Sequence, residues 1–289
     1  MERQIRRLKA SEYAEVRSLG DEIAEACAAE PHCQWYQSEP AGPVAPTLAR
    51  HVDVDCHLAE SRRDLREWAE QNLTPASKAA VETVDLMRPA NTSADIVATL
   101  LYSVTDRPYR ELYETTSQWS AAQRDEVIDV ALRSRTRRDE LLRAFRGGPY
   151  VYDIVMDVGA YRDLHRHRRC QQFRQSYGAS LGFDTPTAIV ESGIQDEYET
   201  LANRALNTVS RFPAPAAEYM LPFATRARFL FKMDFAEAEY ICRLRSGVKG
   251  HFSYRQIAWL MKEKMQQVEP EMGRLMEATP PWVEDPLKR

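Results

Sequence analysis

The hydrophobic residues in the first third of the chain repeat at helical spacing. Residues 10–30 place apolar side chains three or four positions apart and are followed by Pro31, which predicts a helix that stops before the proline. Residues 39–46 are rich in proline and are expected to form a loop. Residues 48–73 predict a second helix, and residues 74–93 predict a connector. Core candidates on the second helix are Leu58, Leu65 and Trp68.

From about residue 93 the pattern changes and includes one clear strand. Residues 93–105 and the charged residues 120–145 predict helices. In YVYDIVMD, residues 150–157, large apolar side chains alternate with other residues, as in a half-buried strand. Residues 160–169 predict a short helix. The arginines after Leu164 would then lie in its last turn, where cations suit the helix dipole.

The C-terminal part of the chain predicts mainly helices. Residues 184–212 fit a helix that is broken at Gly193, and residues 251–270 fit another. Residues 226–247 fit either a helix or a strand that enters a helix, closed by Gly247. Long helices with few strands indicate the α+β class.

Charge and composition narrow the class of protein. A pI near 6.0 and a formal net charge of −4 over 289 residues argue against a nucleic-acid-binding protein, which needs a basic face. The five cysteines are odd in number and widely spaced, which indicates free thiols rather than disulfides. The sequence contains no signal-peptide core and no long apolar run. We therefore expect a cytoplasmic protein with no membrane or nucleic-acid partner.

Cations gather in one segment, HRHRRCQQFRQS, residues 165–176. Arginine binds phosphate through two parallel hydrogen bonds, so the segment is a candidate anion site. The alternative is a solvated helix end. A smaller group of cations surrounds His251 in a glycine-bounded loop, which is either a second anion site or a solvated loop.

The other motifs in the sequence give weaker evidence of function. HVDVDCH, residues 51–57, contains zinc-ligand residue types. On a helix, however, His51 and Asp55 would share a face that excludes His57, and no second ligand pair has the usual spacing, so we expect no metal site. GxSxG, P-loop, GxGxxG and HExxH motifs do not occur, so four large enzyme classes lose their usual sequence support.

Arg166, His167 and Arg168, followed seven residues later by Ser176, form the pattern RHR-x7-S. This pattern resembles the signature of the flavin-dependent thymidylate synthases. A C-terminal block is also similar to that family, through Leu221-Pro222, Asp234, Leu244-Arg245 and His251. The resemblance covers roughly residues 90–270. It implies a flavin-dependent thymidylate synthase-like domain over residues 89–289, preceded by a helical N-terminal extension over residues 1–88.

The resemblance also implies a reaction. The family is a homotetramer with FAD bound between subunits, and it transfers a one-carbon unit from methylenetetrahydrofolate to C5 of a uridine monophosphate while NADPH reduces the flavin. It uses no cysteine nucleophile, so Cys170 need not be catalytic. By carry-over, Arg245 would contact the uracil and stabilise the charge that develops on the ring. FAD would be bound by Ser103, Arg166, His167, Arg168, Asp234 and His251. The nucleotide would be bound by Arg174, Gln175, Ser176, Tyr177, Gly178 and Arg245.

Several positions depart from the family pattern. Arg174 stands where the motif has an acidic residue, Gly178 stands where it has an arginine, and Asp234 replaces an asparagine. The segment LLRAFRGGPY also lacks the usual His, Glu and Thr. A glycine in place of arginine leaves room for a 2′-hydroxyl, so UMP, dUMP or both are candidate substrates. In this the chain resembles the branch that makes 5-methyluridine nucleotides for polyoxin-type nucleoside antibiotics.

Two other functions stay open on the sequence. The chain could be a non-catalytic relative that binds flavin or nucleotide, which the altered LLRAFRGGPY segment favours. It could also be a helical interaction protein in which the basic segment is only surface.

Overall fold

The structure is a computed structural model, and it describes residues 1–29, 49–73, 82–136, 139–212 and 216–287. The chain divides into two compact units. The first comprises Met1–Ala79 with Pro213–Tyr219, and the second comprises Ala80–Phe212 with Met220–Arg289. Within the described residues, none of the helices combines the length and apolar character needed to cross a membrane.

The first unit is helical. It contains α1 (Glu2–Lys9), α2 (Ala14–Ala28) and α3 (Cys56–Asn72). Helices α1 and α2 pack closely because Gly20 has no side chain: a Cβ at this position would lie 3.0 Å from the Leu8 Cβ and from the Lys9 backbone nitrogen. The helix expected over residues 10–30 is confirmed as α2, while the second helix begins later than expected, at Cys56.

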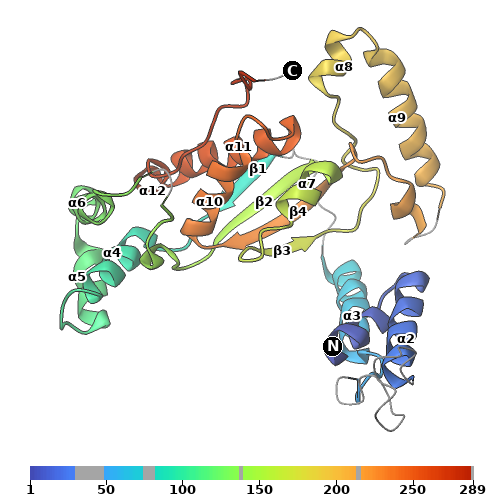
Figure 1. Cartoon of the computed structure of the whole chain (residues 1–289), viewed down its shortest axis with the longest axis horizontal. Helices are drawn as coiled ribbons and strands as arrows, with labels where there is room; N and C mark the ends of the chain where they lie inside the picture. Colours follow the sequence, from blue (N-terminus) through green and yellow to red (C-terminus); the bar gives the residue numbers. More distant parts are fainter. Residues whose placement is uncertain (30–48, 74–81, 137–138, 213–215, 288–289) are drawn as a thin grey trace, which may run out of the picture. The chain divides into compact units, whose positions relative to one another are not determined.

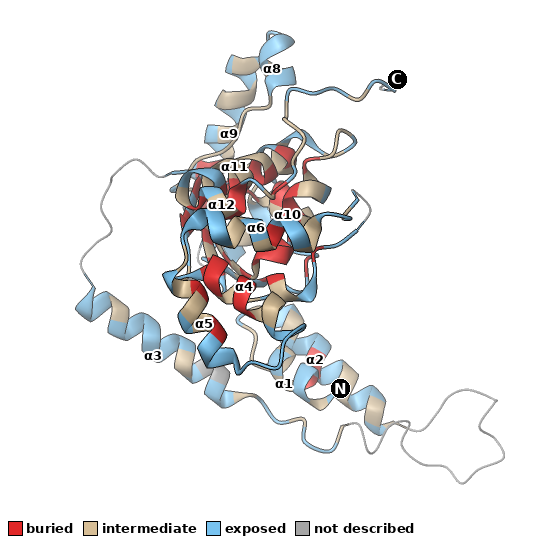
Figure 2. Ribbon diagram, turned by 90° about the vertical axis from the view of Figure 1, so that its left-hand side faces the viewer, coloured by how far each residue is buried: buried red, intermediate tan, exposed pale blue. Residues whose placement is uncertain are grey.

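The prediction that Leu65 and Trp68 of α3 belong to the core was wrong. Leu65 and Trp68 are 67% and 57% exposed, and the ribbon of α3 is largely exposed in Figure 2. Charged residues interrupt the apolar positions of this helix, so it lacks the continuous stripe that burial requires. The side chain of Leu58 lies outside the described residues.

The second unit is built on a four-stranded antiparallel sheet in the order β1-β2-β4-β3. The strands are β1 (Val84–Met87), β2 (Tyr150–Asp157), β3 (Gln171–Arg174) and β4 (Arg226–Met233). The alternation expected for residues 150–157 is confirmed, because one face of the sheet carries the buried apolar side chains of β2 and β4. These are Tyr150, Tyr152, Ile154, Met156, Ala227, Phe229, Phe231 and Met233.

Helices cover the buried face of the sheet (Figure 1). Helix α11 (Phe252–Val268) packs on β1, β2, α7 (Val158–Leu164) and α10 (Phe235–Arg245). The expectation for residues 226–247 is settled in favour of a strand that enters a helix, because β4 leads into α10 through the N-cap Asp234. The remaining helices are α4 (Thr92–Tyr102), α5 (Tyr109–Gln118), α6 (Ala121–Leu132), η2 (Arg143–Phe145), α8 (Thr187–Glu191), α9 (Gln195–Val209), η3 (Ala216–Met220) and α12 (Pro270–Gly273). The α+β class is confirmed.

Three other element predictions need correction. The expected connector contains β1, which pairs with β2. The charged helix ends at Leu132 rather than at residue 145, and α5 precedes it in a stretch for which no helix was predicted. Helix α7 ends at Leu164, so the arginines that follow it lie in a turn and not in a helical last turn. The break at Gly193 is confirmed, with φ at +75° between α8 and α9.

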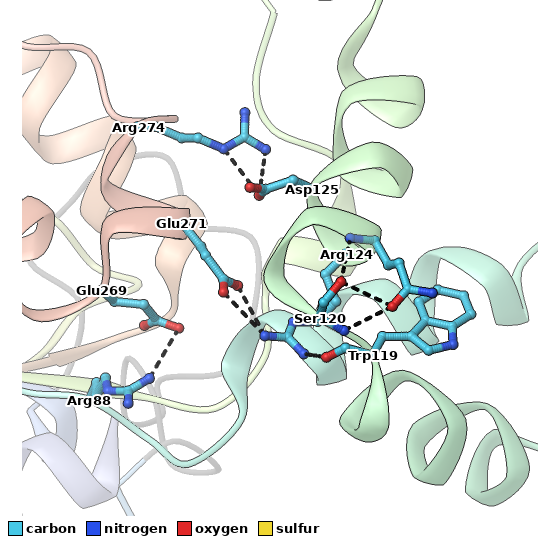
Figure 3. Close-up of polar contacts among 9 residues, drawn as sticks. Arg88, Trp119, Ser120, Arg124, Asp125, Glu269, Glu271 and Arg274 are labelled. Atoms are coloured by element: carbon cyan, nitrogen blue, oxygen red, sulfur yellow. Dashed lines mark hydrogen bonds and ion pairs between the residues drawn. The ribbon is translucent and has the colours of Figure 1, made fainter.

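Ion pairs fasten α12 to α6, as Figure 3 shows. Arg124 lies 3.1 Å from Glu271, and Arg274 contacts both Asp125 and Asp129 at 2.8 Å. Beside them the buried Glu269 accepts a hydrogen bond of 2.6 Å from the Tyr150 hydroxyl and lies 3.7 Å from Arg88. Burial raises the pKa of Glu269 above its ordinary value. These contacts hold the C-terminal end of α11 against the edge of the core.

Candidate functional site

A cavity of about 380 Å³ lies between α10 and the turn that follows α7. The turn is fixed locally: the His167 amide donates to the Leu164 carbonyl, and the Cys170 amide donates to the His167 carbonyl. The Gln172 side chain also donates to the Leu164 carbonyl at 3.2 Å. The residues that line the cavity are Glu140, Leu141, Arg166, His167, Arg168, Arg169, Ala236, Glu237, Glu239, Tyr240, Arg243, Leu244 and Arg245.

His167 is the buried centre of this cavity wall. Its Nδ1 lies 3.3 Å from Oε1 of Glu237, and both side chains are only 4% exposed. Its Nε2 lies 2.9 Å from the Nε of Arg245, which donates a hydrogen bond to it. Two segments that are 78 residues apart in the sequence, the RHR turn and the end of α10, therefore meet at one imidazole.

Two buried glutamates balance part of the cationic charge. Glu237 Oε2 lies 3.4 Å from Arg169, and Glu239 Oε1 lies 2.9 Å from Arg135 and 3.1 Å from Arg243. Neither carboxylate is among the site residues that the sequence predicts. A usable signal was present, because FAEAEYIC places two acidic residues in an otherwise apolar helix, and buried charges in proteins are usually paired.

Some arginines of the cavity wall are not paired with a carboxylate among the described residues. Within the described residues, neither Arg168 nor Arg245 has a carboxylate within ion-pair distance. Arg166 is mostly exposed and lies 3.6 Å from Asp163. Arginine guanidinium groups without a carboxylate partner are well suited to bind an anion.

The other predicted flavin-binding residues lie around or away from this cavity. Asp234 is the N-cap of α10 and pairs with Arg169 at 2.9 Å, so it supports the wall from outside. Ser103 is exposed at the end of α4 and donates to the Leu100 carbonyl of its own helix at 2.6 Å. His251 is the exposed N-cap of α11. Neither Ser103 nor His251 lines the cavity of this chain.

The predicted nucleotide-binding segment lies at the other end of β3. Arg174 is the last residue of that strand, and its guanidinium lies 4.3 Å from the centre of the Tyr177 ring. The Gln175 amide donates to the Arg228 carbonyl at 3.1 Å, and Ser176 is exposed. A Cβ at Gly178 would meet no atom within 4 Å, so this position opens onto free space.

Cys170 is buried, and the segment HVDVDCH does not lie on a single helix. Burial raises the pKa of the Cys170 thiol to about 12, which leaves almost no thiolate near neutral pH. In the segment HVDVDCH, α3 begins only at Cys56, so His51 and Asp55 precede the helix. Over the ranges that the structure describes, no three His, Cys, Asp or Glu side chains gather in a way that could hold a metal ion.

Comparison with known proteins identifies relatives over most of the chain. The sequence model of the family described as Thymidylate synthase complementing protein (Thy1) matches residues 84–271. A UPF0159 protein of Chlamydia muridarum is 26% identical over 282 residues, which is 92% of this chain and 50% of that protein. One from Chlamydia pneumoniae is 28% identical over 265 residues, 88% of this chain and 48% of that protein. The chain thus spans about half the length of these curated relatives.

A solved structure has a similar fold. The crystal structure of the UMP/dUMP methylase PolB from Streptomyces cacaoi, bound with 5-Br dUMP, matches with a TM-score of 0.52 and 14% sequence identity. The match covers 66% of this chain and 93% of that one. At this identity the likeness concerns the fold alone. Because the Thy1 model matches well over half of its residues, the chain belongs to the Thymidylate synthase complementing protein family, that of the flavin-dependent thymidylate synthases.

Proposed function

We propose that this chain is a flavin-dependent methylase that acts on C5 of a uridine 5′-monophosphate, either UMP or dUMP. Methylenetetrahydrofolate would donate the one-carbon unit and NADPH would supply the reducing equivalents. The observation that carries the proposal is the meeting of Arg245 with His167, because each belongs to one of the two segments that resemble the family. Family membership and the fold of a UMP/dUMP methylase support it.

The cavity suits the charged part of FAD, which carries a diphosphate. Five arginines and three glutamates line it, so cations are in excess. Arg168 has no carboxylate within ion-pair distance among the described residues, and His167 and Tyr240 add aromatic rings to the wall. We assign Arg166, His167 and Arg168 to FAD binding on this basis. Bound FAD would supply the redox chemistry, while the protein orients it and excludes water.

Arg245 is the residue we assign to catalysis. Methylation at C5 requires negative charge to develop on the uracil ring, and a fixed guanidinium lowers the energy of that charge. Arg245 lies in the last turn of α10, and its Nε is held by His167, so the guanidinium plane is fixed before any ligand arrives. Preorganisation of this kind avoids a reorganisation cost during the reaction.

The nucleotide would be bound by the segment from Arg174 to Gly178. Arg174 lies over the Tyr177 ring, which restricts its guanidinium at the end of β3. The open space at Gly178 leaves room for a ribose 2′-hydroxyl, which favours acceptance of UMP as well as dUMP.

Ser103, Asp234 and His251 complete the proposed FAD site, which requires more than one chain. Ser103 and His251 do not line the cavity of their own chain. We propose a homotetramer in which Ser103 and His251 face the FAD that is held mainly by another subunit, while Asp234 supports the cavity wall of its own chain through Arg169.

A non-catalytic flavin-binding relative is the second candidate. The segment LLRAFRGGPY lacks the expected polar residues, and a Cβ at Gly147 would lie 2.5 Å from Asp95, so this part of the segment packs on α4. Such a protein would oxidise NADPH through its flavin without forming a methylated nucleotide.

The test is the visible spectrum of the purified protein with FAD, followed by incubation with methylenetetrahydrofolate, NADPH and either UMP or dUMP. A flavin spectrum together with a 5-methylated nucleotide, identified by mass, is the expected result. The product ratio gives the preferred sugar. A protein that binds FAD but yields only NADPH oxidation supports the second candidate, and a protein that stays colourless contradicts both.

A further inference from the structure

Glu237 is a buried residue of the cavity wall to which neither the sequence resemblance nor the proposed function gives a role. The whole residue is 3% exposed and lies in the first turn of α10. Its backbone N–H donates a hydrogen bond of 2.8 Å to Oδ1 of the N-cap Asp234. Burying a carboxylate is costly unless each oxygen has a partner. Here Oε1 lies 3.3 Å from His167 and Oε2 lies 3.4 Å from Arg169.

The hydrogen bonds around His167 determine which ring nitrogen carries hydrogen. Arginine is a donor at every nitrogen and stays protonated in proteins, so the Nε of Arg245 must donate to Nε2 of His167. Nε2 therefore carries no hydrogen and accepts with its lone pair, and the hydrogen of the neutral ring is on Nδ1. Nδ1 lies 3.3 Å from Oε1 of Glu237, a carboxylate oxygen that can accept this hydrogen.

The spacing along α10 makes this three-residue chain possible. Glu237 and Arg245 are eight residues apart, close to two full turns, so they lie on one face of the helix and about 12 Å apart along its axis. The imidazole of His167 enters between their two long side chains. Once Nε is engaged, the four N–H groups on the two terminal nitrogens of Arg245 remain for a ligand.

We propose that Glu237 is a positioning residue: it fixes His167 as the neutral tautomer with hydrogen on Nδ1, and that tautomer fixes the guanidinium of Arg245. The other tautomer would place an N–H of His167 against an N–H of Arg245 and would release the arginine. The effect on turnover rests on the proposed function of Arg245, whereas the tautomer itself does not.

The first measurement is long-range ¹H–¹⁵N NMR of protein labelled with ¹⁵N-histidine and containing no ligand. The His167 signals are identified by their absence in His167→Gln. We expect a hydrogen on Nδ1 and none on Nε2. A ring with hydrogen on Nε2, or on both nitrogens, overturns the proposal regardless of whether the protein is an enzyme.

The second measurement uses three variants. Glu237→Leu removes the acceptor and should give a mixture of tautomers, whereas Glu237→Gln keeps an acceptor oxygen and should preserve the wild-type tautomer. Glu239→Gln is the matched control, because Glu239 is buried in the same helix and pairs with Arg135 and Arg243 but not with His167. An unchanged tautomer in Glu237→Leu overturns the role of Glu237. If Glu237→Leu does not fold, Glu237→Gln decides, because loss of the wild-type tautomer there also contradicts the proposal.

The third measurement compares kcat with KM, because a purely structural role of Glu237 would not change kcat selectively. If Arg245 acts on the transition state, Glu237→Leu should lower kcat by about tenfold to a hundredfold with KM little changed, and Glu237→Gln should recover most of the loss. A rise in KM with kcat unchanged would assign Glu237 to substrate binding instead and overturn the positioning role. If the wild-type protein forms no methylated product, the proposed function fails while the NMR result still decides the tautomer.

Discussion

Replacement of Arg245 by lysine tests the assignment of this residue to catalysis. Lysine keeps the positive charge but has no planar group and no donor at the position of Nε, so the hydrogen bond of 2.9 Å to His167 is lost. The terminal ammonium is then free to move over several rotamers. A preorganised guanidinium becomes a mobile charge, while the cations assigned to FAD are unchanged.

The expected loss of kcat in Arg245→Lys follows from the contacts that Arg245 makes. Arg245 has no carboxylate partner among the described residues, so its charge is not neutralised by a structural ion pair. Loss of one preorganised stabilising donor in an active site typically lowers kcat by about 10²- to 10³-fold, or about 2.7–4 kcal/mol. We expect a decrease of this size in Arg245→Lys with flavin content unchanged.

The assay is the rate of 5-methylated nucleotide formation at saturating substrates, with flavin content measured by absorbance on the same samples. Arg274→Lys is the control, because Arg274 pairs with Asp125 and Asp129 at the contact between α12 and α6. Full activity in Arg245→Lys would reject the catalytic role, and loss of flavin would show instead that Arg245 belongs to the cofactor site.

Four further outcomes are expected. Arg168→Ala should weaken FAD binding by about tenfold to a hundredfold, measured by fluorescence titration, because one charge-assisted contact to the cofactor is lost; unchanged affinity would exclude Arg168 from the FAD site. Gly178→Arg should fold normally, since its Cβ meets no atom within 4 Å and its φ is not positive, and should shift the product ratio toward dUMP; a constant ratio would remove Gly178 from sugar selection. Burial raises the pKa of Glu269 above 4.5, so its protonated form stabilises the fold and that contribution is lost as pH rises through the raised pKa. Glu269→Gln should therefore flatten the fall of Tm above pH 4.5, and a profile that matches wild type would contradict this. Cys170, with a thiol pKa of about 12, should resist iodoacetamide at pH 8 in the folded protein, as judged by peptide mass; rapid labelling would show that the thiol is accessible.

The sequence was sufficient where the signal is local. The alternation of YVYDIVMD predicted β2 with its bounds, and the spacing of Ile257, Leu260, Met261 and Met265 predicted α11. The RHR-x7-S pattern singled out the turn that forms one wall of the cavity. In each case the property depends on neighbours within a few positions, and the period of a helix or strand can be read from them.

Tertiary structure decided everything that depends on a distant partner. β1 and β3 have four residues each, too few to show a period, and they are strands because β2 and β4 offer them hydrogen bonds. The apolar residues Leu65 and Trp68 have helical spacing yet are exposed, so the spacing alone did not decide their burial. The position of Glu237 beside His167 depends on α10 lying against a turn 70 residues earlier in the chain, since the sequence records which side chains are present but not which of them lie in contact.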